Sequence, residues 1–183
     1  MPLDTKMIGS QTESIEHWVD ERWLMAYSAS LGDLNASYMN TASGQVIGHP
    51  LFPVCVEWPA ILDTRKLAAA DMLSDEESRR GVHAAHDLHI FRPIVAGEKL
   101  RTSATMIGVE SIKPGAAYTM RLDSYDDKQQ LVCRTYQLSI YRGVEVIGGS
   151  LSAKPAESSP PAPKALPIDE GQNYEVYIPA NLA

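Results

Sequence analysis

The second half of the chain alternates apolar and polar residues with a period of two, which predicts β-strands. In the first such segment Val82, Ala84, His86, Leu88 and Ile90 share one face. Three further alternating segments span 100–106, 118–122 and 132–140. The turns at 113–115 and 126–128 are short enough for hairpins, so we predict one antiparallel sheet with an apolar face. We expect 144–147 to continue the last strand beyond a bulge at Gly143.

The first half shows a helical period instead. Ser14 is the expected cap of a helix that reaches about Leu31 and stops at Gly32. Pro53 suits the first turn of a second helix, which is expected to run to about 73 with a kink or break at Pro59. Residues 32–53 are rich in Gly, Pro and small polar residues and predict a long functional loop. The second helix is the available cover for the sheet, so the predicted class is α+β.

The chain has 183 residues, which suits one domain with an appendage. Residues 1–149 are predicted to form the domain, and 150–170 read as a linker rich in Pro, Ser and Ala. Residues 171–183 contain a strand-like hexamer at 174–179 that is too short to fold alone. It either pairs with a sheet edge or begins a second domain.

Charge and cysteine content narrow the setting. The net charge is −7 and the basic residues form no stripe, which argues against nucleic-acid binding. No apolar run reaches the roughly 18–20 residues of a membrane span. Cys55 and Cys133 lie far apart and the N-terminus lacks the pattern of a secretion signal, which predicts a reduced, cytoplasmic setting.

Residues 32–38 have the outline of a water-binding motif. An Asp, an Asn two residues later and an imidazole three residues after that hold a water between a carboxylate and a ring nitrogen. The third position here is Tyr38, after Asp33 and Asn35. A phenol with a pKa of about 10 is a poor proton acceptor at neutral pH, whereas an imidazole near 6.5 suits that task. We therefore expect the motif to keep its loop structure but not its catalytic chemistry.

Other histidines offer less. His49 is the nearest imidazole to this loop, which makes it the other candidate for a general base. On a regular strand His86 points away from His83 and His89, so we expect no shared metal ion. Cys55 is expected to be a buried, inert thiol.

Three segments together resemble the MaoC-like enoyl-thioester hydratases and dehydratases, which have the hotdog fold. The family has Asp-x-Asn-Pro-x-His, then Ile-x-His-Gly, then Arg-Pro-x-x-x-Gly-(Asp/Glu). Here the matching segments are Asp33-Leu34-Asn35-Ala36-Ser37-Tyr38, Ile47-Gly48-His49-Pro50 and Arg92-Pro93-Ile94-Val95-Ala96-Gly97-Glu98. The resemblance covers about 14–147 and implies an antiparallel sheet wrapped around a central helix.

The resemblance also implies site roles. Asp33 and Tyr38 occupy the catalytic positions, and Asn35, Gly48, His49 and Pro50 the substrate-binding ones. Tyr38 replaces the catalytic His. Pro50 replaces the Gly whose N–H would face the thioester oxygen, and Pro has no N–H. The loss of one such donor costs about 3–4 kcal/mol of transition-state stabilisation, so this chain is not expected to run the reaction alone.

A Tyr at this position resembles the N-terminal, acyl-accommodating half of double-hotdog dehydratases. The resemblance implies an acyl-CoA or acyl-ACP substrate, no metal or other cofactor, and a homodimer or a heterodimer with a catalytic hotdog subunit. Two alternatives remain. One is a non-enzymatic module that binds or assembles acyl thioesters. The other is a hotdog thioesterase, for which Glu57 is the one carboxylate near the start of the central helix.

Overall fold

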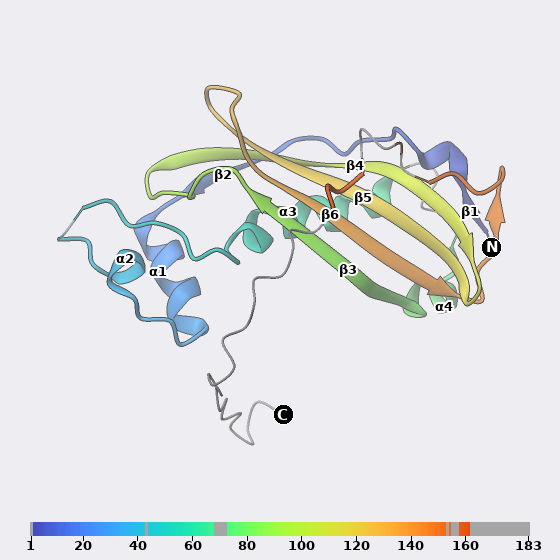
Figure 1. The fold of residues 1–183 in the computed structure, drawn as a ribbon, viewed down its shortest axis with the longest axis horizontal. Coiled ribbons are helices and arrows are strands. Elements are labelled where there is room, and N and C mark those ends of the chain that lie inside the picture. The colour runs from blue at the N-terminus through green and yellow to red at the C-terminus, as the bar shows by residue number, and fades with distance from the viewer. Residues whose placement is uncertain (1, 43, 68–72, 153, 155–157, 162–183) are drawn as a thin grey trace, which may run out of the picture.

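A long antiparallel sheet curves around one helix (Figure 1). The computed structural model describes residues 2–42, 44–67, 73–152, 154 and 158–161. The helices are α1 (Glu21–Ser30), α2 (Ala36–Met39), α3 (Pro53–Asp63) and α4 (Asp75–Arg79), with 3-10 turns η1 (Thr5–Met7) and η2 (Thr64–Lys66). The strands are β1 (Leu3–Asp4), β2 (Ile15–Val19), β3 (Gly81–Ile90), β4 (Glu98–Ile112), β5 (Gly115–Asp126), β6 (Leu131–Arg142) and β7 (Val146–Ile147).

The main sheet has the order β2-β4-β5-β6-β3, and all neighbours in it are antiparallel. The predicted hairpins β4–β5 and β5–β6 are confirmed. Gly115 begins β5 with φ 149°, and a Cβ there would stand 2.2 Å from the carbonyl oxygen of Tyr141. Only glycine permits this approach. The result is the predicted α+β class, with an antiparallel sheet wrapped around a central helix.

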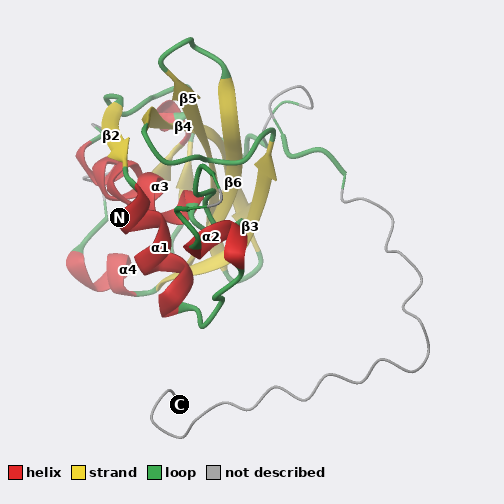
Figure 2. Cartoon of the chain, turned by 90° about the vertical axis from the view of Figure 1, so that its left-hand side faces the viewer, coloured by secondary structure: helices red, strands yellow, loops and turns green. Residues whose placement is uncertain are grey.

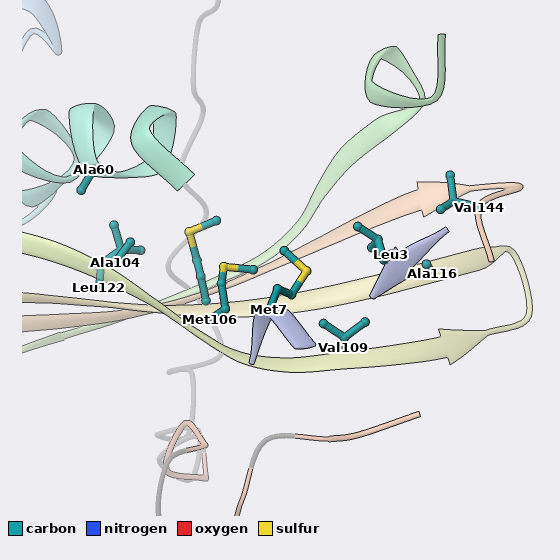
Figure 3. Packing of buried hydrophobic residues seen from close by; sticks show 10 residues of the cluster. Leu3, Met7, Ala60, Ala104, Met106, Val109, Ala116, Leu122 and Val144 are labelled. Atoms are coloured by element: carbon teal, nitrogen blue, oxygen red, sulfur yellow. The ribbon is translucent and has the colours of Figure 1, made fainter. Parts of the chain in front are cut away.

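One face of α3 packs on the sheet. Its buried residues Pro53, Val56, Glu57 and Ala60 follow the helical spacing that forms a single stripe. Figure 3 shows Ala60 directed toward Ala104 and Leu122 on the sheet. Each large apolar side chain removed from water contributes about 1.5–3 kcal/mol, so the burial of this face stabilises the packing of α3 on the sheet.

The predicted helix from Ser14 is wrong over its first turns. Ile15–Val19 is strand β2, which pairs with β4. Helix α1 begins only at Glu21, and its cap is Asp20, whose carboxylate accepts the N–H of Trp23 at 2.7 Å. The apolar spacing of these five residues fits a helix as well as a strand. Their pairing with β4 selects the strand.

The predicted continuation of the last strand is also wrong. Gly143 adopts φ 67° and donates its N–H to Pro114 O, which turns the chain away from β6. Val146–Ile147 then forms β7, which pairs in parallel with β1 in a separate two-stranded sheet. This small sheet covers the end of the core that lies far from α1 and α2 (Figure 1).

The predicted loop 32–53 contains the short helix α2, which contacts α1 at one end of the sheet (Figures 1 and 2). Helix α3 begins at Pro53 as predicted and continues through Pro59 without a break, but it ends at Asp63, so the predicted extension to about 73 is wrong. Residues 68–72 and the predicted tail at 171–183 lie outside the described residues. The start of the predicted linker returns to the sheet, because Leu151 forms a bridge with Val109.

Strand β3 is an edge strand that pairs only with β6 among the described strands. A bulge between His83 and Ala85 inserts one extra residue and breaks the predicted alternation. The rings of His83 and His86 consequently lie 5.3 Å apart, so the prediction that they point to opposite faces is wrong.

Across the described part of the chain, no helix is long and apolar enough to span a membrane.

Candidate functional site

The second and third motifs lie side by side. Gly48 donates its N–H to Ile94 O at 2.7 Å, and Ala96 donates to Val46 O at 3.0 Å. A Cβ on Gly48 would come within 3.2 Å of Leu24 and 3.4 Å of Ile94. The absence of a side chain at residue 48 therefore allows the loop before α3 to pack against the 94–96 segment.

Arg92 holds the turn that carries this segment. Its guanidinium donates to both oxygens of Glu98, at 3.2 and 2.6 Å, and to Asp126 at 3.0 Å. Glu98 also accepts the N–H of Val95 at 2.7 Å. The hydrogen bonds that Arg92 donates to Glu98, and next those to Asp126, raise the pKa of Arg92. Because the guanidinium N–H groups of Arg92 are bonded to these carboxylates, Arg92 stabilises the conformation of the turn.

The first motif folds as two consecutive Asx turns. Asp33 accepts the N–H of Asn35 at 3.0 Å, and Asn35 accepts the N–H of Ser37 at 3.0 Å and so caps α2. These local bonds place Tyr38 at 5.4 Å from the ring of His49 in a T-shaped contact. The loop geometry thus follows from the Asp and Asn side chains, whose preference for such turns is general.

His49 lies closer to Asp33 than sequence reasoning expected. Its Nε2 stands 3.6 Å from Asp33 Oδ2, and its Nδ1 accepts the N–H of Leu51 at 3.1 Å. In the neutral ring the proton therefore sits on Nε2 and faces Asp33. Neither ring nitrogen offers a free lone pair, so this imidazole is not placed to take a proton from water.

The start of α3 presents few amide hydrogens. Pro50 and Pro53 have none, and the backbone N–H groups between them and just after them are bonded within the segment. The bonds run from Leu51 to the His49 ring, from Phe52 to His49 O, from Val54 to Leu51 O and from Cys55 to Phe52 O. A helix start normally offers its first N–H groups to an anion. Here these donors are not available to stabilise a thioester oxygen.

A shallow cavity of about 270 Å³ lies between the start of α3 and the end of β3. It is lined by Tyr38, Ile47, Gly48, His49, Pro50, Pro53, Ile90, Phe91, Arg92, Pro93 and Ile94. It brings together Tyr38, Gly48, His49 and Pro50 of the predicted site. Asp33 reaches it only through His49, and Asn35 is exposed outside it. Ligand pockets usually enclose about 300–1,000 Å³, so the cavity is small for an acyl thioester.

Glu57 is the functional candidate whose partners the sequence did not reveal. It is fully buried on the face of α3 that meets the sheet. Its Oε1 accepts from Thr135 at 2.5 Å, while no donor among the described residues reaches Oε2. Burial raises the pKa of Glu57 to about 7, although the hydrogen bond from Thr135 opposes this. The presence of a carboxyl side chain within an apolar helical segment was the signal in the sequence that could have pointed to Glu57.

The described residues contain no group of three side chains suited to a metal ion.

The chain is similar in sequence to known proteins. A family model described as "FAS1-like, dehydratase domain region" matches residues 6–131, more than half of the chain. UPF0336 protein SCO4636 of Streptomyces coelicolor is 21% identical over 150 residues, which cover 79% of this chain and 99% of that protein.

Solved structures agree with the fold. The C-terminally truncated HadBC (3R-hydroxyacyl-ACP dehydratase) complex of Mycobacterium tuberculosis matches with a TM-score of 0.60 and 14% identity, covering 75% of this chain and 100% of that chain. A MaoC-like dehydratase from Rhodospirillum rubrum matches with a TM-score of 0.53 and 14% identity, covering 74% and 92%. The chain therefore belongs to the FAS1-like dehydratase-region family and has the MaoC-like hotdog fold.

Proposed function

We propose that this chain supplies the acyl-binding half of an enoyl-thioester hydratase or 3-hydroxyacyl dehydratase site, and that a partner hotdog subunit supplies the catalytic Asp and His. The observation that carries the proposal is the state of the groups at 33–55. Nδ1 of His49 accepts a backbone N–H, its Nε2 lies 3.6 Å from Asp33 Oδ2, and the backbone N–H groups of Leu51, Phe52, Val54 and Cys55 are bonded within the segment.

The chemistry explains why both losses matter. In hydration a base removes a proton from water while the water oxygen bonds to C3 of the enoyl thioester. The electron pair of the C2–C3 double bond moves toward the thioester carbonyl, which forms an enolate. C2 then takes a proton, and the carbonyl is restored. The base must have a free lone pair, and the oxygen needs fixed N–H donors. Tyr38 and Pro50 stand where these groups would act. The partner would provide both through its own loop and helix start.

An exposed apolar surface supports a partner. Val54, Trp58 and Leu62 form a stripe on the outer face of α3, where Trp58 is 54% exposed. Ile90 and Phe91, where β3 ends, are exposed as well, and Phe91 is 59% exposed. Large exposed apolar side chains that gather into a patch typically mark an interface. A second hotdog docked here would also enclose the shallow cavity, which this chain lines from one side only.

The proposal is tested with the purified chain, a candidate partner that carries an intact Asp-x-Asn-Pro-x-His motif, and their mixture. Binding of a saturated short and a medium acyl-CoA is measured by calorimetry, and complex formation by light scattering. We expect tight acyl-CoA binding only in the mixture. Trp58→Lys should weaken the complex at least about tenfold, in keeping with a buried aromatic anchor. Arg142→Lys, at an exposed site, is the matched control.

One alternative has a specific observation in its favour. A non-enzymatic acyl-thioester module would need no base and no amide donors, as found at 33–55. Acyl-CoA binding without turnover in any partner combination would select it. The thioesterase alternative is not favoured, because Glu57 faces the sheet and does not line the cavity. An acyl-CoA or acyl-ACP substrate and a cytoplasmic setting stay predictions.

A further inference from the structure

A second ionisable site lies apart from the cavity, between α3 and β3. Glu57 Oε2 stands 3.8 Å from His86 Nε2, and the ring of His83 lies 5.3 Å from that of His86. The Glu57 side chain is 1% exposed and that of His86 27% exposed. The three groups thus lead from the core to the surface of the edge strand. None of them lines the cavity.

We propose that Glu57 and His86 share one proton, and that loss of this proton loosens the edge strand β3 from helix α3. A buried carboxylate oxygen without a donor is costly, whereas a neutral carboxyl carries no charge and can donate to the imidazole once the 3.8 Å separation shortens to hydrogen-bond distance. The bulge in β3 brings the ring of His83 close to that of His86, which is the group that faces Glu57. The inference concerns the chain alone and does not depend on the proposed hydratase role.

The groups around the pair favour a neutral Glu57 at low pH. From β6, Thr135 donates to Oε1, and the buried thiol of Cys133 lies close enough to be affected by Glu57. From β3, His83 lowers and Asp87 raises the pKa of His86, whose pKa is lowered mainly by burial. Burial raises the pKa of Glu57. These directions leave a single proton on the pair near neutral pH.

The proton on Glu57 and His86 can affect the edge strand, because the pair lies between α3 and β3. Strand β3 is held by β6 on one side, and its other edge has no described partner. Its middle residues are exposed on the surface of the sheet. Ionisation of Glu57 would favour openings in which β3 separates from α3 and water reaches the carboxylate. The contribution of Glu57 to holding the edge strand would therefore be largest at low pH and would be lost as pH rises through about 7.

The test is hydrogen exchange of the β3 amides at 85–89 in the full chain, expressed as protection factors from pH 6 to pH 8. We expect protection to fall about tenfold over this range, since an opening that hydrates Glu57 restores an ordinary carboxyl pKa. Glu57→Gln should abolish the fall. Glu76→Gln, at an exposed carboxyl, should behave as the wild type.

Thr135→Val provides a second variant in case Glu57→Gln does not fold. It removes the hydrogen bond that favours the ionised carboxyl, so the fall should move to higher pH. The carboxyl carbon of Glu57 and the ring of His86 should titrate together by NMR in the wild type. A wild-type change below twofold, or an unaltered fall in Glu57→Gln or Thr135→Val, would overturn the proposal.

Discussion

The ring of His49 joins two parts of the motif region: its Nε2 lies 3.6 Å from Asp33 Oδ2, and its other nitrogen accepts from the backbone. The imidazole is therefore a structural link between the 33–38 loop and the start of α3. A catalytic imidazole would instead leave one nitrogen open to water. This relationship supports a positioning role for His49, which stays a prediction.

Replacement of His49 tests the positioning role. His49→Ala removes the acceptor of the Leu51 N–H, and we expect a loss of about 1 kcal/mol in the free energy of unfolding. Asp33→Asn should change it by less than about 0.5 kcal/mol, since an amide oxygen still accepts from Asn35. Urea denaturation measures both. Equal losses in the two variants would contradict this division of roles.

Arg92 should be intolerant of a conservative change. Arg92→Lys keeps the charge but loses the fork that binds Glu98 twice and Asp126 once. We expect a loss of about 1–3 kcal/mol in unfolding free energy, because two largely buried carboxylates would lose donors. Arg142→Lys, at an exposed position, is the control and should leave stability unchanged. A neutral Arg92→Lys would show that the turn is held by other contacts.

Gly48→Ala tests the close approach of the loop and the 94–96 segment. The added Cβ would lie 3.2 Å from Leu24 and 3.4 Å from Ile94, so the neighbours must shift. Overpacking of this kind costs about 1–3 kcal/mol. Thermal unfolding by calorimetry gives the value. No change in melting temperature would mean that the segment adapts without strain.

Glu57 should make stability depend on pH. Its pKa rises from 4.5 to about 7 on folding, so its neutral form favours the folded state below pH 4.5. That contribution is lost as pH rises through about 7, and its full size is about 3 kcal/mol. Glu57→Gln should gain by this amount relative to the wild type between pH 4.5 and pH 8. His86, whose pKa is lowered, acts oppositely below pH 6.5 in both proteins.

Urea titrations at several pH values measure this difference directly. The two proteins should be of similar stability near pH 4.5 and diverge above it. A constant difference across pH would contradict the raised pKa of Glu57.

The long strands were predictable because apolar and polar residues alternate along each of them in the sequence. Residues 15–19 were not, because five residues are too few to separate the two periods and β4 selects the strand. The bulge between His83 and Ala85 leaves no trace in the apolar pattern. All three motifs contribute residues to the cavity. The bonds of His49 and the partners of Glu57 depend on contacts distant in sequence and required coordinates.

The most direct test of the central claim is the rate of water addition to a trans-2-enoyl-CoA, measured with this chain alone and after mixing with a catalytic hotdog partner. The account predicts no turnover above background for the chain alone and full turnover in the mixture, abolished when the partner's motif His is replaced. Full turnover by the chain alone that also survives Tyr38→Phe would contradict it.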